Sequence, residues 1–183
     1  MATLSTPPPV KCICGLLAVS NDLLDEATDA TAEVLGPVQL VSEDIAFTWT
    51  NYYAEEMGPT LQRRFLAVDG LRHPGELARW KRATQEIETR FAARSDAPSP
   101  RPINLDPGYL TEAKLVLASL KNFAHRVYLR DGVFAEVTLQ YRDGRWTSLP
   151  WTFPDYGSGR YDVFFTRVRD ALRRETGKGT PAQ

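Results

Sequence analysis

The chain has 183 residues, of which 43% are hydrophobic and 25% are charged, as in ordinary globular domains. No apolar run approaches the roughly 20 residues that a membrane-spanning helix needs. The two cysteines, Cys12 and Cys14, are too few for a disulfide scaffold or a self-contained four-ligand zinc site. Because the start of the chain shows no signal-peptide pattern, we expect a cytoplasmic protein with reduced thiols and no membrane partner.

The net charge of −1 hides an uneven distribution of charge along the chain. Residues 12–62 contain nine acidic side chains and no lysine or arginine, whereas residues 63–183 contain 21 basic and 14 acidic side chains. Such a division can mark an anionic partner for the basic part, or it can mean that the two parts dock on each other. We favour docking, because neither part contains a dense block of one charge.

The first part of the chain predicts a strand and a helix after an unstructured start. Residues 1–9 are rich in proline and small polar residues and predict a disordered leader. Residues 11–19 form a short apolar run, which suits a buried strand. A helix is expected over residues 22–35, with Asn21 or Asp22 as its N-terminal cap.

The middle of the chain predicts further strands and the clearest helix. Residues 38–50 are expected to be extended, residues 51–60 to form a loop or a short helical turn, and residues 62–69 to form a strand. A helix over residues 73–94 begins at His73, because the proline that follows suits the first helical position. Apolar residues recur in this helix at steps of three and four.

The remainder contains the strongest turn signals. A Pro/Ser-rich linker leads to a short strand over residues 102–110, and Thr111 is expected to cap a helix that ends at Leu120. Asp131-Gly132 and Asp143-Gly144 suit two-residue type I′ turns, because both central positions of these turns need positive φ. They predict a meander of three strands, followed by an amphipathic helix, over residues 124–130, 133–142, 145–151 and 161–175.

These elements predict one α+β domain over residues 10–176, with a frayed tail at 177–183. The order of the first six elements, β-α-β-β-α-β, matches the ferredoxin-like pattern. A short helix, a three-stranded antiparallel meander and a C-terminal helix are expected to follow this ferredoxin-like core.

Common motifs for catalysis and phosphate binding are absent. The one GK pair, at residues 177–178, has neither a strand before it nor a helix after it, so it is not a P-loop. Cys12 and Cys14 share one face of the predicted strand, but only two histidines are present to complete a metal site. We therefore predict no metal site and interpret both thiols as small buried residues. No cofactor is indicated.

His125 and Glu136 are the first candidates for a catalytic pair. With the turn at Asp131-Gly132, Val127 pairs with Glu136, and His125 lies diagonally opposite Glu136 on one face of the sheet. A carboxylate beside an imidazole can orient it for proton transfer, with His125 as the general acid or base. The alternative is a structural pair that anchors a strand in the core.

A second group of candidates surrounds a predicted turn. Asp106-Pro107-Gly108 would bend the chain and present Asp106 as a catalytic carboxylate. The candidate ligand-binding residues are the hydroxyl, cationic and aromatic side chains Tyr109, Lys114, Lys121, Arg126, Trp151 and Tyr156. The alternatives are a structural turn, solvated lysines and an aromatic loop that packs on the protein itself.

Several segments form a recognisable set: ICGLL at 13–17, NYYAEEMG at 51–58 with LQRRF at 61–65, NLDPGYLTEAKLVLASLKNFAHRVYL at 104–129, GVFAEVTLQY at 132–141 and LPWTFPDY at 149–156. In order and spacing they resemble one bacterial family, that of the domain of unknown function 4416. The resemblance implies no established reaction and no accepted catalytic residues. Members often carry the automatic label GTP-binding protein, but this chain lacks the P-loop that would support it. The resembling segments coincide with the candidate residues, which favours a site there.

Three functions are open from the sequence. We favour a small enzyme or binding protein with a polar pocket for an anionic, nucleotide-like ligand, held by Lys114, Lys121 or Arg126. The second is an RNA-binding module, in which aromatic side chains of the sheet stack on bases. The third is a structural or partner-binding protein that uses its acidic first helix as the contact.

Overall fold

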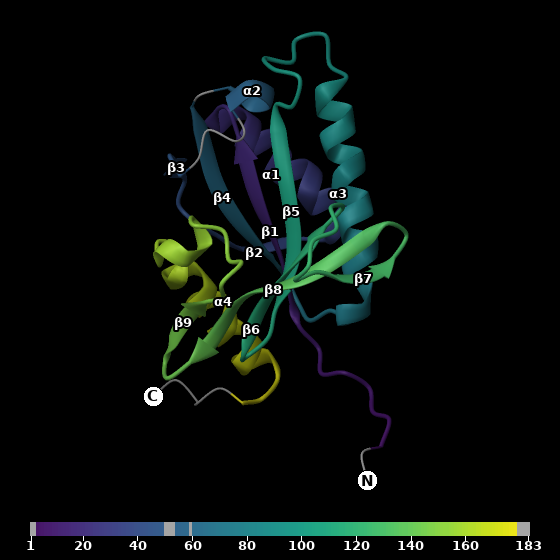
Figure 1. Cartoon of the computed structure of the whole chain (residues 1–183), viewed down its shortest axis with the longest axis vertical. Helices are drawn as coiled ribbons and strands as arrows, with labels where there is room; N and C mark the ends of the chain where they lie inside the picture. Colours follow the sequence, from purple (N-terminus) through teal and green to yellow (C-terminus); the bar gives the residue numbers. More distant parts are fainter. Residues whose placement is uncertain (1–2, 50–53, 59, 179–183) are drawn as a thin grey trace.

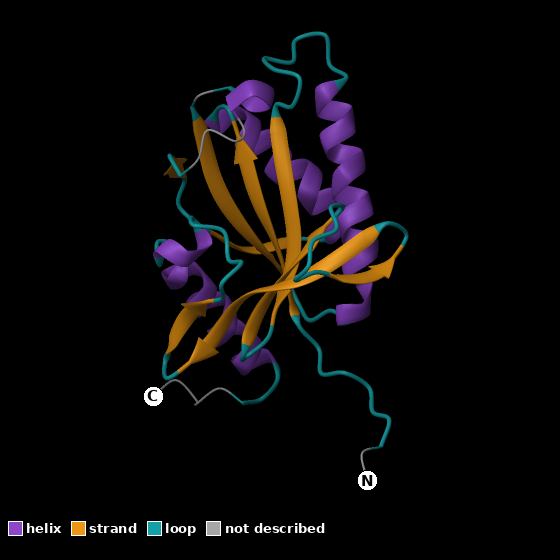
Figure 2. Cartoon of the chain, viewed as in Figure 1, coloured by secondary structure: helices purple, strands orange, loops and turns teal. Residues whose placement is uncertain are grey.

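The computed structural model describes residues 3–49, 54–58 and 60–178. Within them, nine antiparallel strands form one sheet in the order β2-β4-β1-β5-β6-β8-β7, with β3 beside β4 and β9 beside β8 (Figures 1 and 2). The strands are β1 (Lys11–Ala18), β2 (Val38–Val41), β3 (Ile45–Phe47), β4 (Leu61–Val68), β5 (Ile103–Leu110), β6 (Lys114–Ser119), β7 (Val127–Arg130), β8 (Val133–Arg142) and β9 (Arg145–Ser148). The helices are α1 (Asn21–Leu35), α2 (Ala54–Met57), α3 (Leu77–Ala92) and α4 (Asp162–Glu175), with 3₁₀ turns η1 (Pro74–Glu76) and η2 (Tyr156–Ser158).

Helices cover both faces of the sheet. Helices α1 and α3 pack on one face, and α4 packs on the other. Along the central strand β1, Cys12 and Cys14 face α1 and α3, whereas Ile13 faces the core that contains α4. Burial on both faces explains why this strand is a continuous apolar run instead of an alternating one.

The interpretation of the cysteines as small buried residues is confirmed. Cys12 and Cys14 are free thiols and fully buried. Burial raises the pKa of Cys12 to about 12 and that of Cys14 well above its usual value. Neither thiol is therefore a reactive group in the folded chain.

The helix starts are set by short polar side chains. Ser20 caps α1, and its Oγ accepts the backbone N–H of Leu23 at 3.3 Å. The expected caps, Asn21 and Asp22, are thus wrong by one or two residues; they already lie inside the first turn. His73 stands before η1, where its Nδ1 accepts the N–H of Gly75 at 3.1 Å.

The acidic part of the chain docks on the basic part, as expected. Four acidic side chains from α1, α2 and the segment before β3 pair with arginines that follow them in the sequence. The pairs are Arg64–Asp25 at 2.7 Å, Arg64–Asp44 at 2.6 Å, Arg94–Glu26 at 2.5 Å and Arg101–Glu56 at 3.3 Å. These ion pairs within the chain explain part of the uneven distribution of charge without an external partner.

Two local predictions between residues 102 and 120 are wrong. Asp106-Pro107-Gly108 lies inside β5 instead of forming a turn, because all three residues pair with β1. The expected helix from Thr111 to Leu120 is instead strand β6. Its LVLA run is buried between β5 and β8, which favours a strand over a helix.

The two hairpin turns are confirmed. Asp131, Gly132, Asp143 and Gly144 all have positive φ, between 51° and 77°. The predicted meander is correct in its strands but not in its arrangement. Strand β6 occupies one edge of β8, and β7 and β9 share the other edge.

The structure shows an α+β fold, but its full sheet order differs from that of a four-stranded ferredoxin-like sheet. Strands β6, β8, β7 and β9 continue the sheet beyond β5. Of the predicted leader and tail, residues 3–9 are exposed without regular structure, and residues 1–2 and 179–183 lie outside the described residues, as do 50–53 and 59 of the predicted loop. In the described part of the chain, the helices are too short or too polar to cross a bilayer.

Candidate functional site

The sheet divides between β5 and β6. These strands pair only from Gly108 to Leu110, so the first half of β5 has no strand on that edge. Two side chains of α3 bond to the freed backbone at Leu105: Glu88 accepts its N–H at 2.9 Å, and Lys81 donates to its carbonyl at 2.6 Å. In the view of Figure 1, β8 crosses β5 obliquely, which shows how the two parts of the sheet diverge.

A cavity of about 580 Å³ lies at this division. Its walls come from α3, β3, β4, β5, β6 and β8 and from the segments 120–126 and 153–156. Five cationic side chains line it: Arg63, Lys81, Arg101, Lys121 and Arg126. Among the described residues, the acidic side chains in the wall are Asp106, Glu136 and Asp155, and the aromatic ones are Phe47, Trp49, Phe123, Phe153 and Tyr156.

Arg63 lies at the buried end of the cavity, between two carboxylates. Its Nη1 is 3.4 Å from Asp106 Oδ2, and its Nη2 is 3.4 Å from Asp155 Oδ2. The rings of Phe47 and Tyr156 lie 5.3 and 5.8 Å from the guanidinium carbon. Burial raises the pKa of Asp155, and the neighbouring Arg63 opposes this shift.

Two polar atoms at this end are buried without a hydrogen-bond partner among the described residues: Arg63 Nε and the hydroxyl of Tyr156. A buried unsatisfied group of this kind costs about 1–3 kcal/mol, which a bound water or ligand would offset. Gly15 leaves space beside them, because a β-carbon there would lie 3.1 Å from the Tyr156 oxygen and 3.0 Å from the ring of Phe65.

Polar side chains continue from Asp106 along the wall. The side-chain amide of Asn104 donates from Nδ2 to Asp106 Oδ2 at 2.7 Å, and its Oδ1 accepts a hydrogen bond from Arg101. Arg101 is also 3.3 Å from Glu88. The pKa of Glu88 is raised by burial, and Lys81 opposes that shift. The network fixes the positions of the side chains along β5.

The opposite wall contains Glu136, whose side chain is almost completely buried. Its Oε2 accepts from Arg126 Nε at 2.6 Å and lies 3.0 Å from His125 Nε2. Arg126 also donates to the hydroxyl of Ser119 at 2.7 Å and to the carbonyl of Lys121 at 2.9 Å. The guanidinium of Arg126 is thus held in place by three acceptors.

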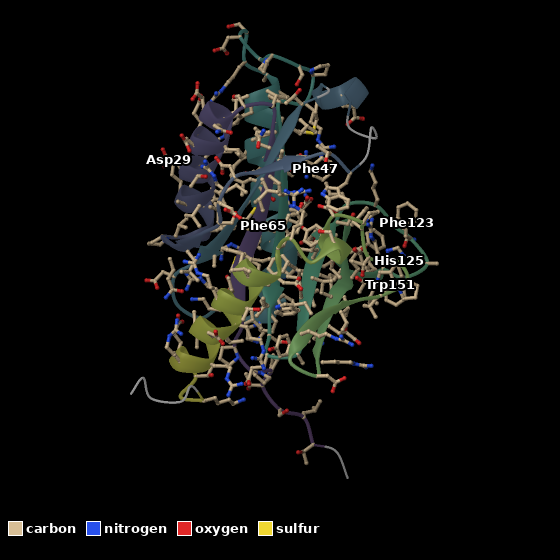
Figure 3. All side chains as sticks on the ribbon, turned by 90° about the vertical axis from the view of Figure 1, so that its left-hand side faces the viewer. Asp29, Phe47, Phe65, Phe123, His125 and Trp151 are labelled. Carbon is tan, nitrogen blue, oxygen red and sulfur yellow. The ribbon has the colours of Figure 1, made fainter. Side chains whose placement is uncertain are left out.

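His125 lies behind Glu136 and does not line the cavity. Its ring is stacked between Phe123, with centroids 5.9 Å apart, and Trp151, with centroids 5.4 Å apart. Figure 3 shows these three rings side by side at one edge of the molecule. Trp151 is fixed by a hydrogen bond from its indole N–H to the Val137 carbonyl at 2.9 Å.

The predicted contact between His125 and Glu136 is confirmed, but the register behind it is wrong. Val127 pairs with Ala135 instead of Glu136, because the ladder between β7 and β8 contains an irregularity after Tyr128. His125 precedes β7 and reaches Glu136 from the preceding loop.

The cavity brings together five of the nine candidate residues: Asp106, Lys121, Arg126, Glu136 and Tyr156. His125 and Trp151 lie next to it. Tyr109 and Lys114 are not in its wall: Tyr109 packs against the core under α1 and α3, and Lys114 is exposed at the start of β6.

Arg63 and Asp155 were not predicted as site residues. Arg63 stands two residues before Phe65 in β4 and therefore shares its buried face. A charged residue in phase with buried apolar ones is the signal that would identify it. Asp155 offers a weaker signal, as the one acid in the aromatic segment 149–156.

Fold and site together define an α+β protein with a polar, aromatic-lined cavity at a division in its sheet. The chain belongs to the family of the domain of unknown function DUF4416, whose model matches residues 8–172. A search of curated proteins finds no match to this sequence. Among the described residues, no three His, Cys, Asp or Glu side chains are grouped so that they could hold a metal ion.

Proposed function

We propose that the chain is a binding protein or small enzyme whose cavity takes an anionic, nucleotide-like ligand. The observation that carries this proposal is the lining of the cavity, in which cationic and aromatic side chains occur together. Cations attract a phosphate or carboxylate, and aromatic rings pack against a planar base. The volume of about 580 Å³ is within the usual range for small-ligand sites.

The residues of this proposal have distinct roles. Lys121 and Arg126 lie on one wall and supply positive charge to the anion. Glu136 is one of the carboxylates that line the cavity, and we assign it the acid–base role because His125 and Arg126 hold it in place. His125 acts through Glu136 as a positioning residue, because its ring lies behind the carboxylate and is fixed between two aromatic rings.

Two finer expectations belong with the proposal. We propose that β2, β4, β1 and β5 with α1 and α3 form a ferredoxin-like unit; their mutual order and antiparallel pairing support it. We also propose a cytoplasmic location, which the two free and buried thiols support.

Calorimetric titration with adenosine monophosphate, adenosine and inorganic phosphate tests the proposal. The monophosphate should bind more tightly than either of its parts. Lys121→Ala should weaken that binding by about tenfold, the effect of one charged hydrogen bond. The matched control is Lys114→Ala, which removes a lysine outside the cavity and should leave binding unchanged. Absence of binding, or an equal loss in both variants, contradicts the proposal.

A second candidate function, RNA binding, is favoured by the ring stack outside the cavity. Phe123 is 56% exposed and Trp151 is 38% exposed, so the stack presents aromatic surface to solvent. Stacked rings of this kind bind bases of single strands. Fluorescence anisotropy with single-stranded RNA at two salt concentrations should then show salt-sensitive binding that Trp151→Ala weakens. If neither small anions nor RNA bind, the structural or partner-binding function is the remaining one.

A further inference from the structure

The two ends of the cavity differ in charge. At the buried end, Arg63 contacts two carboxylates, Asp106 and Asp155, and the buried Lys81 in the same lining is paired with Glu88. Towards the opening lies Lys121, which is exposed, whereas the guanidinium of Arg126, beside the ring of Phe123, is buried and paired with Glu136. This polarity gives a ligand a preferred direction in the cavity.

We propose that the buried end, formed by Asp106, Arg63 and Tyr156, binds an uncharged hydroxyl-bearing group of the ligand, and that the anionic group stays at the Lys121 end. The ligand class is then a phosphorylated sugar or a nucleotide, in contrast to a simple polyanion. This inference rests on the proposed function and adds the orientation of the ligand.

The charge balance around Arg63 disfavours an anion at its guanidinium. With Asp155 ionised, the group of Arg63 and two carboxylates carries a net negative charge. With Asp155 protonated, which its burial favours, the group is neutral. In neither state does Arg63 offer an anion an excess of positive charge, because its charge is already balanced by its neighbours.

Hydrogen-bonding capacity at this end matches a hydroxyl group. Among the described residues, Arg63 and Asn104 both contact Asp106 at Oδ2, so Oδ1 can accept from a ligand hydroxyl. The Asp106 side chain is 26% exposed, which keeps it accessible from the cavity. Arg63 Nε and the Tyr156 hydroxyl are buried in the same wall without partners. A hydroxyl both donates and accepts, so it suits a carboxylate beside unpaired donors.

The test compares two phosphates that differ in their hydroxyl groups, ribose 5-phosphate and methyl phosphate, by calorimetric titration. The unaltered chain should bind ribose 5-phosphate about tenfold or more tightly than methyl phosphate, the value of a hydrogen bond to a charged group. Asp106→Asn keeps the shape of the side chain and removes its charge. It should reduce this ratio to below about threefold without weakening methyl phosphate.

The outcomes separate this inference from the proposed function. An equal affinity of the unaltered chain for the two probes overturns the inference without any variant. So does tighter binding of both probes by Asp106→Asn, because the anion would then lie beside residue 106. If neither probe binds and adenosine monophosphate does not bind either, the proposed function itself fails. Circular dichroism of the Asp106→Asn chain shows whether its fold is kept; if it is lost, the ratio measured on the unaltered chain decides.

Discussion

Gly108 occupies the last point at which β5 and β6 remain paired before the sheet divides. A β-carbon at this position would lie 2.3 Å from the backbone oxygen of Val116 and 2.7 Å from a methyl carbon of Leu117. Real carbon–oxygen contacts are never so short. The two strands can therefore approach this closely only because residue 108 is glycine and has no β-carbon. Gly108 is two residues from Asp106, which lines the cavity, so the close approach of the strands is next to the cavity wall.

We expect Gly108→Ala to destabilise the fold by about 3 kcal/mol or more, at the upper end of overpacking changes, because the backbone of β6 has to move. The control is Gly157→Ala, where the nearest atom is the hydroxyl of Ser148, which can rotate away. Urea unfolding measures both variants. Equal stability of Gly108→Ala and the unaltered chain would contradict the close approach of β5 and β6.

For single residues, the contact between His125 and Glu136 could be predicted from the sequence, whereas the role of Arg63 could not. His125 and Glu136 were brought together by a hairpin whose turn is encoded locally in Asp131-Gly132. The contact survives a change of register because the imidazole reaches it from a loop. Arg63 was not found, because its role depends on partners that come from segments 43 and 92 residues away.

Strand β5 is the element that depends most on side chains of a helix. Its edge at Leu105 is bonded by Lys81 and Glu88 of α3 in place of a neighbouring strand. No local pattern indicates this, since Asp106-Pro107-Gly108 carries the composition of a turn. Pairing with β1 along its whole length overrides that preference. The prediction of a helix at β6 failed similarly, because a short apolar run does not distinguish a strand from a buried helix.

The buried carboxylate of Glu88 gives α3 and β5 a pH-dependent link. Its pKa is raised in the folded chain, chiefly by burial, above the 4.5 of the unfolded chain. The folded state therefore holds this proton more tightly, and the resulting stabilisation is complete below pH 4.5 and lost as the pH rises through the folded-state pKa.

Glu88→Gln replaces the carboxyl group with an amide that does not titrate. The variant should therefore not lose this stabilisation as the pH rises. Urea unfolding at pH 4 and pH 7 measures the free energy of unfolding of both chains. The value for the unaltered chain minus that for the variant should be larger at pH 4 than at pH 7. Glu86→Gln, on the exposed side of the same helix, is the control for losing one carboxylate. A relative stability of the unaltered chain that grows towards pH 7 would show that ion pairing with Lys81 and Arg101 outweighs burial.

For the whole molecule, the two charge-divided parts of the chain meet in one fold through ion pairs such as Arg94–Glu26 and Arg64–Asp44. The α+β class and the amphipathic helices could be predicted, because they depend on composition and periodicity. The nine-stranded order and the division of the sheet could not, because they depend on pairings between distant segments. The cavity is a product of that division and therefore of the tertiary fold.

The central claim is that the cavity between β5 and β6 is the ligand site. An NMR titration of the ¹⁵N-labelled chain with adenosine monophosphate tests it most directly, because it locates binding residue by residue. We expect saturable shift changes that concentrate at residues 104–106, 117–126 and 153–156 and at Glu136, with Lys114 and α1 unaffected. Changes confined to the surface of α1 or to Val127–Arg130, or no changes at millimolar ligand, would contradict the account.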